Sequence, residues 1–321
     1  MHFTPDLYNE ILVAPLSRNA DELKIISGYA TSSMAERHLM EHAQLKLSIL
    51  VGMCPHDGVS ITNHRGFVFL ARHHAGGFQC RYRLEIPTHS KLYIWYSKGT
   101  PLEAYVGSAN YTQQAFLLNS QNEILSECDP LEADKYFQTQ LGRSADCLAP
   151  EIENEIPIVK VVRQPVASRG RGQFSPRPNI VTNRENVVVT SVELPLYSTR
   201  TGHVEAISGL NWGQRADRNR DQAYLPVPAP VQRCHFFPSI AVRFHVATDD
   251  GEMLEMSVAQ ANGKAIHTPV QNAALGAYFR KRLGVPSEQL VTDADLARYG
   301  RRTVTFTKFD DETYYMDFSV R

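Results

Sequence analysis

A histidine and a lysine two positions apart begin the stretch of the chain best suited to chemistry. His89 and Lys91 would leave the same face of an extended strand. A hydrophobic run follows at residues 92–96, and then come Gly107-Ser108-Ala109-Asn110 and Glu123. An imidazole, an ammonium and an amide brought together suit an anionic, tetrahedral phosphate.

Cleaving a phosphodiester without a metal requires a nucleophile, groups that stabilise the non-bridging oxygens, and an acid for the leaving alkoxide. His89 can attack phosphorus and form a phosphohistidine. Lys91, Ser108 and Asn110 can hold the oxygens. We expect Glu123 to accept a hydrogen bond from the second ring nitrogen of His89, which would fix its tautomer. A lone H-x-K or G-S-x-N is equally explained by a buried imidazole or a turn, so the hypothesis depends on their order and spacing.

The segments that must position these residues read as strands alternating with helices over residues 1–150. This alternation predicts a largely parallel sheet with covered faces. Ser108 is a candidate N-cap, so we expect a helix to begin near Asn110 with free N–H groups beside the site. Strands are expected at 23–28, 46–52, 79–86, 92–96, 102–106 and 123–128, and helices at 31–42 and 131–141.

The 321 residues are enough for two domains, each with its own core. We place the first domain at 1–150, a linker at 151–183 and the second domain at 184–321. The linker is rich in proline and contains the arginines of residues 168–173. The second domain is mostly β, with short strands separated by Asp and Gly turns and a helix at 272–283, which suggests a small barrel.

Composition excludes several classes of protein. No run of about 18 apolar residues predicts a membrane span, and the N-terminus lacks the pattern of a secretion signal. The five cysteines are scattered and never form a C-x-x-C pair, which favours free thiols in a reducing cytoplasm over a zinc site. The net charge of −1 means that any DNA-binding surface must be local.

The order His89-x-Lys91, Gly107-Ser108-x-Asn110 and Glu123 resembles the active-site motif of the phospholipase D superfamily. More narrowly it is similar to the restriction endonucleases of the BfiI and NgoFVII type. The common superfamily pattern has an aspartate where this chain has Tyr96, and the restriction-enzyme branch lacks it too. The resemblance implies an α/β phospholipase D-like N-terminal domain that hydrolyses DNA without a metal or other cofactor in the chemical step, with His89, Lys91, Ser108, Asn110 and Glu123 as its catalytic residues.

The chain contains one H-x-K motif, whereas the superfamily site uses two. The resemblance therefore implies a homodimer with one composite site that contains His89 of both subunits. Some relatives work with a separate helicase-like ATPase. Because this chain has no G-x-x-x-x-G-K-[ST] loop, any ATP dependence would come from such a partner.

The second half concentrates side chains that can read DNA bases. Arg, Gln and Asn make bidentate contacts with base edges, and the alternative is a solvated loop in which the arginines pair with Asp217 and Asp221. The nuclease-like first half favours DNA reading. This half resembles the B3-like DNA-binding pseudobarrels of the NgoFVII-type enzymes, with one arm near residues 211–220 and a second near 260–280. The candidate DNA-binding residues are Trp212, Gln214, Arg215, Arg218, Asn219, Arg220, Lys264 and Arg280.

The leading hypothesis is a sequence-specific restriction endonuclease acting on double-stranded DNA. A phospholipase D-type lipid phosphodiesterase is one alternative, but it would normally carry a second motif in the same chain. A non-catalytic DNA-binding protein, with the first domain serving only for dimerisation, is the other. A non-catalytic DNA-binding protein has no cleavage to lose when His89 is changed, so loss of DNA cleavage would separate it from the leading hypothesis.

Overall fold

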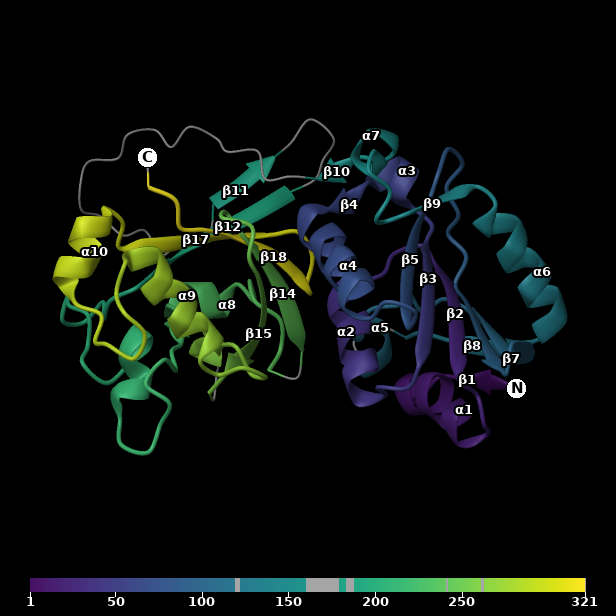
Figure 1. Ribbon diagram of the computed structural model, residues 1–321, viewed down its shortest axis with the longest axis horizontal. Helices are drawn as coiled ribbons and strands as arrows, with labels where there is room; N and C mark the ends of the chain where they lie inside the picture. The colour runs from purple at the N-terminus through teal and green to yellow at the C-terminus, as the bar shows by residue number, and fades with distance from the viewer. Residues whose placement is uncertain (119–121, 160–178, 183–187, 241, 261–262, 321) are drawn as a thin grey trace. The chain divides into compact units, whose positions relative to one another are not determined.

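The chain folds into two compact units, Met1–Lys160 and Val161–Arg321, each with its own hydrophobic core (Figure 1). The computed structural model describes residues 1–118, 122–159, 179–182, 188–240, 242–260 and 263–320. Most of the expected linker therefore lies outside the described residues, as do residues 261 and 262 of the expected second arm.

The first unit is a sheet with helices on both faces. Its strands are β1 (His2–Phe3), β2 (Glu22–Ser27), β3 (Lys46–Val51), β4 (Val59–Ser60), β5 (Phe78–Arg83), β6 (Leu92–Ser97), β7 (Thr100–Gly107), β8 (Leu125–Cys128), β9 (Ser144–Asp146) and β10 (Ile158–Val159). Its helices are η1 (Tyr8–Val13), α1 (Ala14–Ser17), α2 (Ser32–Glu41), α3 (Cys54–Asp57), α4 (Ile61–His73), α5 (Gln113–Leu117), α6 (Pro130–Leu141) and α7 (Ile152–Glu155).

The main sheet has the order β1-β8-β7-β6-β2-β3-β5-β9. Only β2, β3 and β5 run parallel, and β6, β7, β8, β1 and β9 pair antiparallel to their neighbours. The expectation of a largely parallel sheet was therefore wrong. The reason is a tight β6–β7 hairpin, in which Lys98 and Gly99 have φ of 50° and 81° and no crossover helix intervenes.

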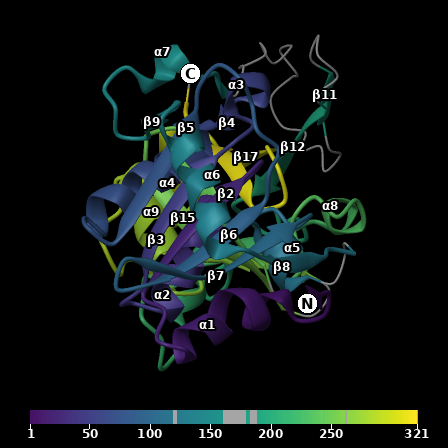
Figure 2. The same ribbon diagram turned by 90° about the vertical axis from the view of Figure 1, so that its right-hand side faces the viewer.

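Both faces of this sheet are covered, as the alternating pattern predicted. The helices α2 and α4 pack together on one face, over the larger apolar cluster that includes Ile25, Ile49 and Phe67. On the other face, α6 places Ala133 and Phe137 against a smaller cluster (Figure 2). Strands β2 and β3 lie between the two clusters, so their carboxyl ends are held rigidly.

The second unit is a strongly curved sheet with the order β11-β12-β17-β18-β14-β15-β16-β13. Because β13 also contacts β12, the sheet almost closes into a barrel, as the mostly-β pattern predicted. Its strands are β11 (Asn179–Thr182), β12 (Val188–Pro195), β13 (Leu225–Pro226), β14 (Arg243–Thr248), β15 (Met253–Ala259), β16 (Ala265–His267), β17 (Thr303–Lys308) and β18 (Thr313–Asp317). Its helices are η2 (Gly209–Gln214), α8 (Ala229–Arg233), α9 (Ala274–Leu283) and α10 (Asp293–Tyr299).

The expected helix at 272–283 is present as α9, and it ends at Gly284, whose φ of 66° suits glycine. Helix α10, which begins with a capping box between Thr292 and Asp295, was not predicted. Within the described residues, no helix is long and apolar enough to cross a lipid bilayer.

Candidate active site

The H-x-K segment crosses the carboxyl ends of β2 and β3. Its approach is fixed at Gly52, whose carbonyl accepts a hydrogen bond from the Thr88 N–H at 3.0 Å. A Cβ on Gly52 would lie 2.0 Å from the Thr88 carbonyl oxygen, so only glycine permits this approach. The segment then enters β6, where Leu92 pairs with Ile26. The nucleophile candidate His89 is thus an exposed side chain at the end of two buried strands.

Lys91 folds back onto His89. Its ammonium lies 2.9 Å and 3.0 Å from the two imidazole nitrogens and donates to the His89 carbonyl oxygen at 2.7 Å. Lys91 is 5% exposed, and this burial lowers the pKa of its ammonium, while the nearby Glu123 carboxylate opposes the shift. The predicted imidazole and ammonium therefore lie in contact, and the ammonium can donate a hydrogen bond to a phosphate oxygen bound there.

Asn110 reaches the same point from the segment after β7. Its side-chain oxygen accepts from the Tyr29 N–H at 3.2 Å and from the Ser27 hydroxyl at 3.4 Å. Its amide NH₂ has no protein partner in the part of the chain that the structure describes, so it can donate to a bound anion. The structure thus brings together His89, Lys91 and Asn110 as the sequence predicted.

Gly28 shows how closely these side chains pack. A Cβ at this position would lie 2.9 Å from His89 Cδ2 and 3.4 Å from Asn110 Oδ1. Gly28 directly follows β2, so the end of this strand forms the floor beneath His89 and Asn110. A glycine immediately after a buried strand was the available sequence signal for this floor.

The Ser108 and Glu123 pair differs from the expectation. The Glu123 carboxylate accepts a hydrogen bond from the Ser108 hydroxyl, and no hydrogen bond joins it to His89. Ser108 also accepts from the Ile124 N–H at 3.0 Å, which ties the end of β7 to the segment before β8. The proposed contact of Glu123 with His89 within one chain was therefore wrong, although Glu123 lies close enough to Lys91 to affect its pKa.

The helix expected near Asn110 was also misplaced. Helix α5 begins at Gln113, and its N-cap is Thr112, whose hydroxyl accepts from the Ala115 N–H at 3.2 Å. Ser108 does not cap it because its hydroxyl is occupied by Glu123 and Ile124. Side chains rather than a helix N-terminus consequently surround His89.

Two residues beside His89 were missed from the sequence. The Tyr29 ring contacts the His89 ring edge to face, with centroids 5.9 Å apart, and the Tyr29 hydroxyl donates to the Asp57 carboxylate. This hydrogen bond is the main reason why the pKa of Asp57 is lowered, and His56 contributes by a contact of 2.6 Å. Neither residue belongs to a recognisable motif, because Tyr29 follows β2 and Asp57 ends α3.

A buried histidine supports the site from behind. His38 Nε2 lies 3.0 Å from the Leu12 carbonyl oxygen, and His38 Nδ1 lies 2.9 Å from the Tyr111 hydroxyl. Since a carbonyl can only accept, Nε2 carries the proton and Nδ1 accepts from Tyr111. Burial lowers the pKa of His38 to about 4, so the ring is neutral at pH 7. Tyr111 follows Asn110 directly, and its N–H donates to Ser27 at 2.9 Å.

As for metal donors, no group of three or more His, Cys, Asp and Glu side chains among the described residues is arranged to hold an ion. The five cysteines are free thiols. The groups that surround His89 include an ammonium and an amide, which are suited to donate to an anion.

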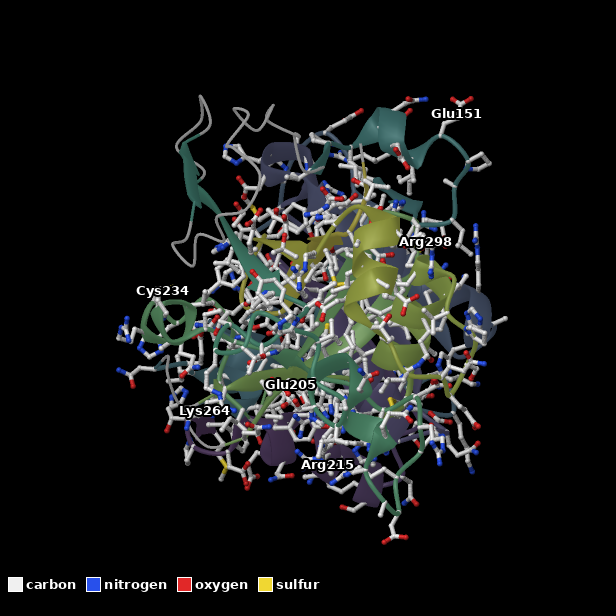
Figure 3. All side chains as sticks on the ribbon, turned by 90° about the vertical axis from the view of Figure 1, so that its left-hand side faces the viewer. Glu151, Glu205, Arg215, Cys234, Lys264 and Arg298 are labelled. Atoms are coloured by element: carbon white, nitrogen blue, oxygen red, sulfur yellow. The ribbon has the colours of Figure 1, made fainter. Side chains whose placement is uncertain are left out.

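In the second unit, the predicted first arm is a loop built on η2. Arg218 places its guanidinium 4.0 Å from the centre of the Trp212 ring, and Gln214 accepts from Arg220 at 3.1 Å. Arg215 donates to the Ile207 carbonyl at 2.9 Å. These three arginines, with Asn219 and the separate Lys264, are exposed (Figure 3 labels Arg215 and Lys264).

Arg280 is not a surface residue. Its side chain is 1% exposed, pairs with Asp221 at 3.2 Å and donates to the carbonyls of Gln289, Leu210 and Arg220. Its assignment to DNA binding was therefore wrong, because α9 turns Arg280 inward to hold the loop of the first arm. Asp221 is likewise used by this buried pair, so it does not neutralise the exposed arginines.

Comparison with known proteins gives two family matches. A model of the NgoFVII restriction endonuclease N-terminal PLD domain matches residues 5–154, and one of the NgoFVII C-terminal B3-like DNA-binding domain matches residues 185–310. No curated protein matches the chain in sequence. Among solved structures, it is similar to NucT from Helicobacter pylori (18% identity, TM-score 0.33, 46% of this chain and 97% of that one). It is also similar to a phospholipase D family member, Nuc from Salmonella typhimurium (13% identity, TM-score 0.34, 45% of this chain and 93% of that one).

A phospholipase D-like nuclease unit joined to a B3-like DNA-binding unit defines a sequence-specific DNA endonuclease. The two matches cover most of the chain and name the same enzymes. The chain belongs to the NgoFVII family of restriction endonucleases.

Proposed function

We propose that this endonuclease cleaves DNA without a metal, through a covalent intermediate on His89. One ring nitrogen of His89 attacks phosphorus, the P–O bond to the leaving oxygen breaks, and a second imidazole gives that oxygen a proton. Water then attacks the phosphohistidine, the P–N bond to His89 breaks, and the second imidazole takes the proton of the water. The observation that carries the proposal is the contact of the Lys91 ammonium with both His89 nitrogens, beside the side-chain amide of Asn110.

Lys91 and Asn110 act in this proposal as the donors to the non-bridging oxygens. An ammonium taken out of water interacts more strongly with a developing negative charge than a hydrated one does. Lys91 meets this condition because it is almost fully buried while its neighbour His89 is exposed. Ser108 and Glu123 hold the segment that carries Asn110 and keep a carboxylate near the ammonium.

The second imidazole is proposed to be His89 of the partner subunit in a homodimer. Three observations support a dimer: the chain has a single H-x-K motif, His89 is accessible, and apolar side chains lie beside Ser108 on an exposed edge. Val106 and Ile124 are 42% and 43% exposed there. A two-fold axis near this edge would bring identical strands and both imidazoles to one phosphodiester.

The second unit is proposed to select the DNA sequence through the exposed polar side chains of the first arm and Lys264. Arg215→Ala or Arg220→Ala should cost roughly 1–3 kcal/mol of discrimination if the arginine contacts a base edge. A helicase-like ATPase partner is proposed only as the source of any ATP dependence. The cytoplasm is the expected location because the cysteines are free thiols.

Cleavage of plasmid DNA in excess EDTA tests the proposed chemistry. We expect the full chain to cut under these conditions and His89→Ala to bind DNA specifically without cutting. An acid-labile covalent DNA adduct on trapped wild-type protein, absent from His89→Ala, would identify the intermediate. Strict dependence of the chemical step on Mg²⁺, or undiminished cutting by His89→Ala, would reject the mechanism.

A further inference from the structure

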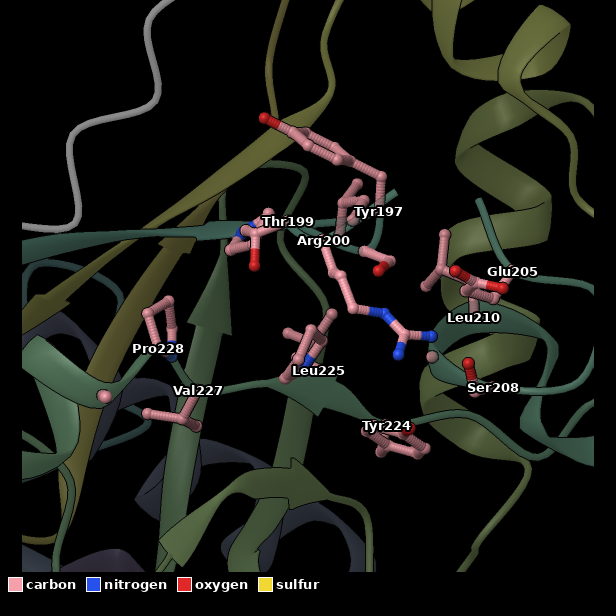
Figure 4. Close-up of a pocket in the computed structure, with 16 residues that line it drawn as sticks. Tyr197, Thr199, Arg200, Glu205, Ser208, Leu210, Tyr224, Leu225, Val227 and Pro228 are labelled. Carbon is pink, nitrogen blue, oxygen red and sulfur yellow. The ribbon is translucent and has the colours of Figure 1, made fainter. Parts of the chain in front are cut away.

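A cavity of about 480 Å³ lies in the second unit, beside the start of η2. Its walls come from the segment after β12, from the first residues of η2 and from β13 with the beginning of α8 (Figure 4). Binding sites for small molecules typically enclose roughly 300–1,000 Å³. The cavity is thus large enough for a nucleotide, and nothing in the DNA-reading arm or the nuclease site accounts for it.

Apolar and aromatic side chains form part of the lining. Leu210, Leu225 and Val227 line it together with the rings of Tyr197 and Tyr224. One face of Tyr197 is covered by the Arg302 guanidinium, 4.5 Å from the ring centre. Flat, apolar surfaces of this kind favour a planar ring over a flexible chain or a hydrated ion.

Polar groups at the rim supply complementary hydrogen-bonding capacity. Arg200 has no hydrogen bond or ion pair with other described residues, and its guanidinium extends between Leu210, Ser208 and Tyr224 (Figure 4). The Glu205 carboxylate uses one oxygen to accept from Thr201 at 2.8 Å, which leaves the other oxygen available. A guanidinium, a carboxylate oxygen and the Ser208 hydroxyl match the mixed donors and acceptors at the edge of a nucleobase, or a base edge and its phosphate.

The cavity adjoins the loop of the first arm. The Tyr224 ring, on its wall, contacts Trp212 edge to face with centroids 5.8 Å apart, and Arg218 covers Trp212 at 4.0 Å. Arg218 is therefore linked through Trp212 and Tyr224 to the cavity that Arg200 also lines. DNA held by the loop would therefore lie near the cavity.

We propose that the cavity binds one nucleotide of the bound DNA, turned out of the double helix. The base stacks against the apolar and aromatic walls, and Arg200 with Glu205 contacts its polar edge. The cost of unstacking one base differs between sequences, so this cavity would add sequence preference without a further groove contact. The inference rests on DNA recognition by this unit and is independent of the histidine chemistry. A free nucleotide has the same chemistry and is the second source that the experiment distinguishes.

The experiment uses the full chain with His89→Ala, so that DNA stays uncut, and the duplex that this chain binds most tightly in a randomised pool. 2-Aminopurine is placed at each position of the duplex in turn, and its fluorescence reports unstacking on binding. We expect a large rise at one position. Added Arg200→Gln should remove this rise and weaken binding about tenfold, as for one lost bidentate contact. The matched control Arg233→Gln, which removes an exposed arginine of α8, should change binding less than twofold.

A second variant fills the cavity instead of removing charge. Ala229 is exposed at its rim, so Ala229→Trp should fold normally and reproduce the loss of the fluorescence rise. Calorimetry with the four deoxynucleoside monophosphates tests whether the cavity binds a free nucleotide. Saturable binding that requires Arg200, without a rise at any duplex position, would assign the cavity to a free nucleotide.

Two results overturn the proposal in different ways. If both cavity variants bind the duplex like Arg233→Gln and no monophosphate binds, the cavity takes no nucleotide. If the parent chain discriminates no duplex from another, DNA recognition by this unit fails, and the proposed source of the nucleotide fails with it.

Discussion

The Tyr29 ring meets the His89 imidazole edge to face, with their planes at 79° and their centroids 5.9 Å apart. Burial is the main cause that raises the pKa of the Tyr29 hydroxyl to about 12, and the hydrogen bond to Asp57 is the next. The hydroxyl is therefore a constant donor to Asp57, which fixes the ring. This contact limits the orientations open to the imidazole before any substrate arrives.

Tyr29→Ala should lower the cleavage rate by up to about a hundredfold, because a small misplacement of a reacting group can cost that much. Tyr29→Phe keeps the ring but loses its tie to Asp57, so it should lose less. The pH profile of single-turnover cleavage should shift in Tyr29→Ala, which a purely structural role would not produce. Phe69→Ala, which removes a ring of similar exposure on α4, serves as the control. Equal rates for Tyr29→Ala and Phe69→Ala would dismiss Tyr29 as a positioning residue.

Gly28→Ala should impair cleavage more than DNA binding. The added Cβ would lie 2.9 Å from His89 Cδ2, so the imidazole must move. Gly77→Ala is the matched control, since its Cβ would meet nothing closer than 3.6 Å and its backbone is not left-handed. Cleavage rates and duplex affinities of both variants, measured at the same temperature, check this expectation. An unimpaired Gly28→Ala enzyme would mean that His89 does not act from the observed position.

Glu123→Gln should move the alkaline limb of the cleavage profile to lower pH. Burial lowers the pKa of Lys91, and the Glu123 carboxylate counteracts this effect. Without that charge the pKa falls further, and the ammonium is lost at a lower pH. Gln can still accept from Ser108, so the segment itself should stay in place. Measurement of kcat/KM between pH 7 and 10 tests the direction of this shift. An alkaline limb at the same or a higher pH would contradict a role for charged Lys91.

The three groups that meet at the site were predictable because their motif flanks two consecutive strands. His89 and Lys91 directly precede β6 and Asn110 follows β7, and the hairpin of these two strands places the start of β6 beside the end of β7. The partner of Glu123 was not predictable in the same way. It depends on how the segment before β8 returns past Gly107, where a Cβ would lie 2.0 Å from the Ile124 carbonyl oxygen.

Sequence periodicity also could not separate Arg280 from the exposed arginines near it. Helix α9 contains Arg280, Lys281 and Arg282 in succession, and these three neighbours have different environments. Arg280 is buried on Asp221, Lys281 is exposed beside Glu252, and Arg282 pairs with Asp249. The direction in which each side chain leaves the helix decides whether it is buried or exposed. The acidic partners come from segments distant in the sequence, so the helix sequence alone does not reveal them.

Arg280→Met should therefore destabilise the second unit rather than weaken a DNA contact. Removing one member of a buried ion pair typically costs roughly 3–5 kcal/mol, because the remaining charge stays buried without its partner. Lys281→Met, next to it on the surface, should change the free energy of unfolding by less than about 1 kcal/mol. Urea unfolding of both variants provides the measurement. A stable Arg280→Met protein with weakened DNA binding would restore Arg280 to the DNA interface.

His38 should make the stability of the first unit depend on pH in a defined direction. Its pKa is about 4 in the folded chain, against an ordinary value of 6.5, because the ring is buried. The unfolded chain therefore binds more protons between these values, so the contribution of His38 is complete above pH 6.5 and is lost as the pH falls toward 4. The loss should be on the order of 3 kcal/mol.

Urea unfolding of the wild type and of His38→Gln at pH 7 and pH 4.5 checks this, with His73→Gln on the surface as control. The wild type should lose more stability than His38→Gln over this interval, and parallel losses would mean that His38 titrates normally in the fold.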